Sequence, residues 1–292
     1  MGYCKQIFAG ALMAVGFVLT SATFAASEDY PVDTASVALL PAKVKAAGVL
    51  RIAMPDQGAP FNFKQGEELK GMEPDLARAI AATLGLKPEI TLTPFTSAIP
   101  GLQASKFDLS FGQFYIRKDR LQVVDFISDW KTYNVFMVLK EKGIRPTQIL
   151  DLCGHSVGAM SGTVQLDALQ KNNGKCTSGT ININAFPSMA NAVLALSSGR
   201  IDAVFVDPDV SRAARKDNSD FVESGKLNEG LTAIAVARNE QLTGLAEAVR
   251  SAMVKLDQSG AYKKILDAYG TGYGAIDKFD IYKQDSVPPV YQ

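Results

Sequence analysis

Short apolar stretches alternate with amphipathic stretches along most of the chain, and few fold classes accommodate that order. The apolar stretches predict strands at 49–54, 89–92, 107–111, 156–159, 180–186, 201–206 and 233–237. The amphipathic stretches predict helices at 73–84, 97–105, 163–171, 189–198, 242–256 and 262–269. Strands that alternate with helices indicate an α/β architecture with largely parallel sheets, and the pattern occurs twice, so two α/β units are expected.

Charge and length narrow the class of protein further. The 292 residues carry 30 Lys and Arg against 30 Asp and Glu, with no cluster of basic residues. Nucleic-acid binding needs clustered Lys and Arg opposite the phosphates, so the composition argues against that function. The length is sufficient for two domains with a core each.

The first 26 residues have the pattern of an export signal. Lys5 is followed by the apolar run 7–19, and Thr23-Phe24-Ala25 offers a small-residue cleavage site. The run has the length of a signal-peptide core and is short for a membrane span of ~20 residues. We therefore expect residues 1–26 to be a cleaved signal and the protein to be periplasmic; a retained N-terminal anchor is the alternative.

Two cysteines remain after the predicted signal, Cys153 and Cys176. An even pair in an exported chain predicts a disulfide, and two buried free thiols are the alternative. Cys4 precedes the apolar run and would leave with the signal. His155 is the only histidine and no Cys-x-x-Cys spacing occurs, so we expect no metal site.

Three predicted strand ends carry polar residues that could bind a small molecule. Arg120 could hold a carboxylate, Gly162 and Thr163 could offer N–H groups and a hydroxyl, and Asp207 could accept from an ammonium. Ligands of open α/β sheets bind at this edge, and together these groups match an α-amino acid. Each also has an ordinary structural interpretation: a solvated loop charge for Arg120, and helix caps for Thr163 and Asp207.

Catalytic and cofactor motifs are poorly supported. Nucleophilic catalysis would have to use His155, which has no nucleophile elbow or evident partner near it. The glycine-rich segments lack the G-x-G-x-x-G and Walker spacings, so no nucleotide cofactor is expected.

Several segments carry a resemblance to a known family over 46–270. In chain order they are GVLRI at 48–52, APFNF at 59–63, GMEPDLA at 71–77, IPGLQ at 99–103, DR at 119–120 with VDF at 124–126, DLCG at 151–154, SGT at 161–163, GRIDA at 199–203 and Gly260-Ala261-Tyr262. By their order and spacing the sequence resembles the polar-amino-acid-binding family of bacterial periplasmic solute-binding proteins (family 3), the receptors of ABC importers.

The resemblance implies a two-lobed fold with a ligand cleft and two crossover strands, near 130–134 and 228–232. Lobe 1 is then expected at 40–131 plus 232–292, and lobe 2 at 132–231. Carried over by position, Arg120 is the carboxylate clamp, Thr163 a second carboxylate donor and Asp207 the ammonium acceptor. Phe95 stands where the family places an aromatic residue on the ligand side chain, and Met160 is expected to line the opposite lobe.

The side-chain pocket departs from the family pattern. Gly58 replaces the usual aromatic residue before Pro-Phe, and the preceding acid is displaced to Asp56. Gln113 and Tyr115 stand where small residues are common, and Arg117 replaces a usual Thr. Because Gly58 stands in place of the aromatic residue, one wall of the pocket is expected to be open.

These features together predict a monomeric receptor that closes two lobes on an amino acid or a similar zwitterion and delivers it to a membrane permease. An exported enzyme on the same scaffold, resembling cyclohexadienyl dehydratase, is the alternative, with Glu73 and Asp56 as the acids nearest the cleft. A kinase sensor domain is disfavoured, because no membrane-spanning segment follows.

Overall fold

The structure is a computed structural model that describes residues 1–2 and 30–291. The predicted signal peptide and its cleavage site lie outside the described residues, apart from residues 1–2. Within the described part, no helix has both the length and the apolar character that a membrane crossing requires.

Two long antiparallel strands, β6 (Val124–Leu139) and β10 (Phe221–Ala237), run through the middle of the molecule and pair along most of their length. On one side β10 is followed by β5 (Leu109–Tyr115), β1 (Val49–Pro55) and β4 (Lys87–Thr93). On the other side β6 is followed by β9 (Ala203–Val206), β7 (Ser156–Met160) and β8 (Asn182–Phe186). The two segments in which lobe crossings are predicted lie within β6 and β10.

The sheet is mixed rather than largely parallel. β1 is parallel to β4 and β5, and β7 is parallel to β8 and β9, as predicted. The two long strands run antiparallel to both groups, so the sheet as a whole contains parallel and antiparallel pairs. The strand expected at 107–111 is β5, which starts two residues later and continues to Tyr115 because its residues are buried on both faces.

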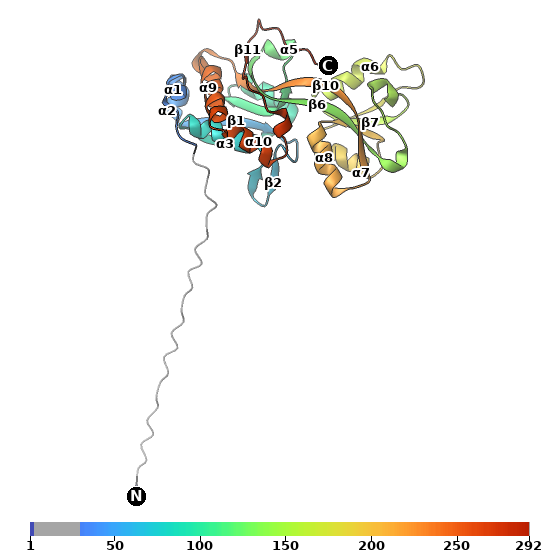
Figure 1. Ribbon diagram of the computed structural model, residues 1–292, viewed down its shortest axis with the longest axis horizontal. Coiled ribbons are helices and arrows are strands. Elements are labelled where there is room, and N and C mark those ends of the chain that lie inside the picture. Colours follow the sequence, from blue (N-terminus) through green and yellow to red (C-terminus); the bar gives the residue numbers. More distant parts are fainter. Residues whose placement is uncertain (3–29, 292) are drawn as a thin grey trace.

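Helices cover the two strand groups separately (Figure 1). Around β1 lie α1 (Thr34–Ala38), α2 (Ala42–Ala47), α3 (Met72–Thr83), α4 (Phe95–Gln103), α9 (Leu245–Gln258) and α10 (Ala261–Ala268). Around β7 lie α6 (Val164–Asn173), α7 (Met189–Ser197) and α8 (Pro208–Asp217). The short elements are α5 (Lys118–Leu121), β2 (Phe63–Gln65), β3 (Glu68–Lys70) and β11 (Ile281–Tyr282).

Apolar packing follows this division only in part, because the larger of two clusters continues through the crossover region into α7, β9 and α8 of the second strand group. A large cluster joins β1, β5, α3 and α9 and contains the fully buried Trp130 and Tyr262. A smaller cluster lies between the second strand group and α6, with Val157, Leu169 and Phe205 at its centre. The predicted two-lobed α/β fold is therefore confirmed, with β6 and β10 as the connections between the lobes (Figure 1).

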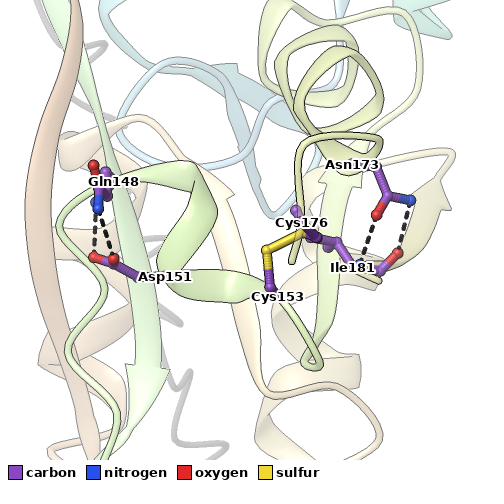
Figure 2. Close-up of a disulfide and its surroundings, with 6 residues drawn as sticks. All are labelled: Gln148, Asp151, Cys153, Asn173, Cys176 and Ile181. Carbon is purple, nitrogen blue, oxygen red and sulfur yellow. Dashed lines mark hydrogen bonds between the residues drawn. A yellow bond between two sulfur atoms is a disulfide. The ribbon is translucent and has the colours of Figure 1, made fainter. Parts of the chain in front are cut away.

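The predicted disulfide between Cys153 and Cys176 is present. It ties the segment before β7 to the loop after α6 (Figure 2). Beside it, the Asn173 side chain donates to the Ile181 carbonyl (3.1 Å) and accepts from the Ile181 N–H (2.7 Å). Gln148 and Asp151 cap the turn that leads to Cys153. The loop is thus held by both a covalent bond and hydrogen bonds.

Reducing this disulfide is expected to lower the free energy of unfolding by roughly 3 kcal/mol, because the unfolded chain regains the freedom of a loop of 23 residues. Denaturant titrations of the oxidised and reduced protein check the value. The Cys153→Ala/Cys176→Ala variant is the control, since reductant should not change its midpoint. Equal midpoints for oxidised and reduced protein would contradict the prediction.

The C-terminal segment after α10 is largely irregular, but it is attached to the rest of the fold by side-chain contacts. Tyr273 donates to Asp209 Oδ2 on α8 (2.5 Å), and its ring packs edge-on against Trp130 of β6. Tyr291 stacks on Tyr115 (4.7 Å between ring centroids) and accepts from the Ile116 N–H (2.7 Å). The segment therefore contacts β6, α8 and the carboxyl end of β5.

Candidate functional site

A cavity lies where the carboxyl end of β5 faces the N-termini of α6 and α8. Its lining residues come from both strand groups and are Gln57, Phe95, Gly112, Gln113, Tyr115, Arg120, Met160, Thr163, Val164, Gln165, Met189, Asp207 and Val210. This is the edge of the sheet at which the sequence predicts a ligand.

Seven of the ten predicted ligand residues line this cavity: Phe95, Gln113, Tyr115, Arg120, Met160, Thr163 and Asp207. Gly162 lies next to it, with its carbonyl bonded to Arg120. Gly58 lies outside, on an adjoining apolar groove against α7 and α8 that shares Gln57, Met189 and Val210 with the cavity. Asp56 is exposed and lines a separate surface hollow.

Arg120 is buried, so the interpretation as a solvated loop charge is wrong. Its guanidinium donates to the carbonyls of Tyr115 (3.0 Å) and Gly162 (3.1 Å), and it lies over the rings of Phe95 and Phe114. The described residues place no carboxylate in ion-pair contact with it. Burial, with help from Arg117, lowers the pKa of Arg120 to about 10. The site thus contains a buried cation that lacks an anion.

Asp207 is the complementary case. It stands at the N-cap position of α8, but its side chain does not cap the helix. Asn134 donates to one carboxylate oxygen (3.0 Å) and Gln165 to the other (3.4 Å), and no cation contacts either oxygen in the described chain. Burial raises the pKa of Asp207 to about 7, and the nearby Asp209 adds to the effect. Asp207 is therefore a buried acid in need of a cation.

Thr163 behaves as the helix cap that its position also allows. Its hydroxyl donates to the Met160 carbonyl (2.7 Å) and accepts from the Leu166 N–H (3.4 Å). Both hydrogen-bonding directions are thus used within the chain. As a carboxylate donor, Thr163 would have to give up its bond to Met160.

Tyr115 and Arg117, two further positions that depart from the family pattern, lie in different places. Tyr115 is buried, and its hydroxyl donates to the Asn228 carbonyl on β10 (3.1 Å), so it links the cavity to a crossover strand. Arg117 lies outside the cavity, partly exposed, and pairs with Asp119 and with Asp167 on α6. Arg117 is thus a partly exposed residue that links α5 to α6 rather than a wall of the cavity.

Two further acids lie behind the cavity rather than in it. Glu73 accepts from Asn62 Nδ2 (2.7 Å) and Gln113 Nε2 (3.0 Å), and burial raises its pKa to about 7. Burial raises the pKa of Asp129 to about 8, and the charge of the nearby Glu73 adds to the effect. Neither Glu73 nor Asp56, the two acids named from the sequence, contacts the cavity. Asp207 is the one acid among its lining residues.

Sequence reasoning missed six lining residues: Gln57, Gly112, Val164, Gln165, Met189 and Val210. Gln165 could have been found, because it follows Thr163 by two residues at the start of a predicted helix. Gln57 stands in the segment that departs from the family pattern, between Asp56 and Gly58. No group of His, Cys, Asp and Glu suited to a metal ion occurs within the described residues.

The arrangement suits a zwitterion. A buried guanidinium and a buried carboxylate line the same cavity, and each is short of a counter-charge. A ligand with a carboxylate at one end and an ammonium at the other would satisfy both, because charge-assisted hydrogen bonds are strong where water is excluded.

Comparisons with known proteins agree with this chemistry. Residues 50–272 match the model of the bacterial extracellular solute-binding proteins, family 3. A probable histidine-binding protein of Campylobacter jejuni is 27% identical over 223 residues, which cover 75% of this chain and 84% of the relative. The crystal structure of the P235GK mutant of ArgBP from T. maritima superposes with a TM-score of 0.72 and 28% identity, covering 80% of this chain and 98% of the other.

A third similarity concerns enzymes. The ancestral amino acid-binding protein AncCDT-1, described as a precursor of cyclohexadienyl dehydratase, has a TM-score of 0.69 and 26% identity to this chain. The matched region covers 78% of this chain and 97% of the ancestral protein.

Proposed function

Since this chain belongs to the bacterial extracellular solute-binding proteins of family 3, which gives it a binding role, we propose that it captures a free α-amino acid between its two lobes. The ligand carboxylate binds Arg120 and the ligand ammonium binds Asp207. The observation that supports the proposal most is the pair of opposite, uncompensated buried charges in one cavity.

Capture proceeds by closure of the lobes. In the proposed division, residues 40–131 and 232–292 form one lobe and carry Arg120, while 132–231 form the other and carry Asp207 and Thr163. Both ligand charges are paired only when the lobes are together, so the ligand binds the closed form more tightly than the open one. Such differential affinity is what shifts an open–closed equilibrium.

The closed complex delivers its ligand to the permease of an ABC importer. Support comes from the family and from relatives named as periplasmic binding proteins of transporters. We further propose a periplasmic location, reached by export and cleavage of the signal at 1–26, and a monomeric protein.

A thermal-shift screen over the twenty amino acids and related carboxylates tests this function. The cognate amino acid at 100 times its dissociation constant is expected to stabilise the protein by ~2.7 kcal/mol, because it binds only the folded state. Decarboxylated and N-acetylated forms of the same amino acid are matched controls that remove one charge each, and both should give little shift. If no α-amino acid shifts the midpoint, the proposal is wrong.

A dehydratase activity on the same scaffold is the second candidate function, and the similarity to AncCDT-1 supports it. A dehydratase needs an acid placed to protonate the leaving hydroxyl. Among the lining residues only Asp207 could serve, and the proposed ammonium contact would occupy it. Turnover of prephenate or arogenate by the purified protein, abolished in Asp207→Asn, would favour the enzyme; binding without turnover favours the receptor.

A further inference from the structure

Two side-chain amides in the cavity each have a buried polar atom without a hydrogen-bond partner. They are Nε2 of Gln57 and Oε1 of Gln113, in residues that are 4% and 5% exposed. An unpaired buried donor or acceptor costs free energy in the free protein. A ligand group that pairs with both atoms would remove that cost.

The orientation of the Gln113 amide is fixed by its neighbour. Its Nε2 donates to Glu73 Oε1 (3.0 Å), and the ionised form of Glu73, which can only accept, requires the nitrogen on that side. The oxygen is therefore the atom left unpaired. The Gln113 backbone has a φ of 52°, a left-handed conformation that costs energy in a residue with a side chain. The residue with this unfavourable backbone is thus the one whose amide contacts Glu73.

Gln57 is tied to the same network. Its backbone N–H donates to Asn62 Oδ1 (3.1 Å), and Asn62 Nδ2 donates to Glu73 Oε2 (2.7 Å). The backbone of Gln57 and the side chain of Gln113 are therefore linked through Asn62 and Glu73. One buried network therefore holds the backbone of Gln57 and the side chain of Gln113, and both residues line the same cavity.

The remaining lining determines the charge that the subsite tolerates. Apart from Arg120 and Asp207, every lining residue is uncharged. Under the proposed function, the α-carboxylate and α-ammonium of the ligand occupy those two. A charged ligand side chain would then be buried without a counter-ion, which is costly.

We propose that this cavity selects an amino acid whose side chain ends in a carboxamide, such as glutamine or asparagine. The ligand carbonyl accepts from Gln57 Nε2, and the ligand N–H donates to Gln113 Oε1. The methylene groups of the ligand pack against Met160, Met189 and Val210. The inference rests on the proposed function and adds the ligand class to it.

Calorimetric titration of the unmodified protein tests the selectivity directly. The ligands are glutamine and asparagine, with glutamate, methionine, serine, arginine and histidine as comparisons. We expect a carboxamide to bind at least 100-fold more tightly than methionine, because a site built around hydrogen bonds discriminates strongly against a ligand that lacks them. The same margin is expected over glutamate and arginine.

The variant Gln57→Leu tests the assigned donor. It should weaken binding of the preferred carboxamide roughly 10- to 100-fold and leave methionine binding unchanged or tighter. Gln258→Leu, at the exposed end of α9, is the matched control and should change neither. Thermal midpoints of both variants check folding.

The outcomes separate this inference from the proposed function. Preference for arginine, histidine, serine or methionine overturns the carboxamide assignment and leaves amino-acid capture intact. An equal loss of affinity for all ligands in Gln57→Leu also overturns the carboxamide assignment. Failure to bind any α-amino acid overturns the proposed function itself.

Discussion

Arg120→Leu is expected to weaken binding of the cognate amino acid about 30-fold to several thousand-fold. The ligand carboxylate would be desolvated without its partner, a loss of roughly 2 to 5 kcal/mol. Calorimetry on the purified variant measures the loss. The same substitution should leave the unliganded protein at least as stable as the parent, because it removes a buried cation that has only carbonyls and aromatic rings as neighbours.

The control is Arg78→Leu on α3, where the arginine pairs with Asp75 and is 37% exposed. It should change the affinity by less than twofold, since surface ion pairs contribute little and this one does not line the cavity. A loss below threefold in Arg120→Leu, with the fold intact by thermal midpoint, would remove Arg120 from the clamp role.

Affinity is also expected to fall as the pH is lowered below 7. In the free protein burial raises the pKa of Asp207 to about 7, so at lower pH its carboxyl is increasingly protonated. The ammonium of the ligand favours the ionised form and lowers that pKa on binding, so capture releases a proton. The association constant should therefore drop about tenfold per pH unit between pH 6.5 and pH 5.

Calorimetric titrations in buffers of different ionisation enthalpy measure the number of protons released on binding. Asp207→Asn is the control: it should bind weakly, with a flat profile over the same range. Glu73 and Asp129 also have raised pKa values, but they do not line the cavity. Both residues are present in Asp207→Asn as well, so a pH dependence caused by them would remain in that variant. A flat profile in the unmodified protein would exclude Asp207 as the ammonium acceptor.

Local patterns explain how much of the fold the sequence predicts. The parallel strands and most of the long helices are visible because their apolar residues recur with a regular period over a single segment. Cys153 and Cys176 are found because an exported chain with two cysteines has few other options. Asp207 is found because it comes directly after a predicted buried strand, and Arg120 because it lies in the segment that follows another.

The elements that escape prediction depend on partners distant in the chain. The first half of β10 contains Gly225, Gly230 and several charged residues and is only partly buried, so it has no strand-like alternation. Its conformation comes from pairing with β6. Gln57 and Gln113 likewise become informative only through Glu73, which is hydrogen-bonded to Gln113, 40 residues further along the chain, and to Asn62. Neither relation leaves a periodic signal.

The attachment of the C-terminal segment has a practical consequence for how the protein is produced. Tyr291 stacks on Tyr115, a wall residue of the cavity, and a side chain added at Gly230 would collide with its ring. Affinity tags, fluorophores or fusion partners joined to the C-terminus would follow closely after Tyr291, which contacts a wall residue of the proposed binding cavity and the crossover strand β10. Reporters meant to leave the proposed open–closed equilibrium undisturbed therefore belong near Tyr30, at the other end of the segment 30–291.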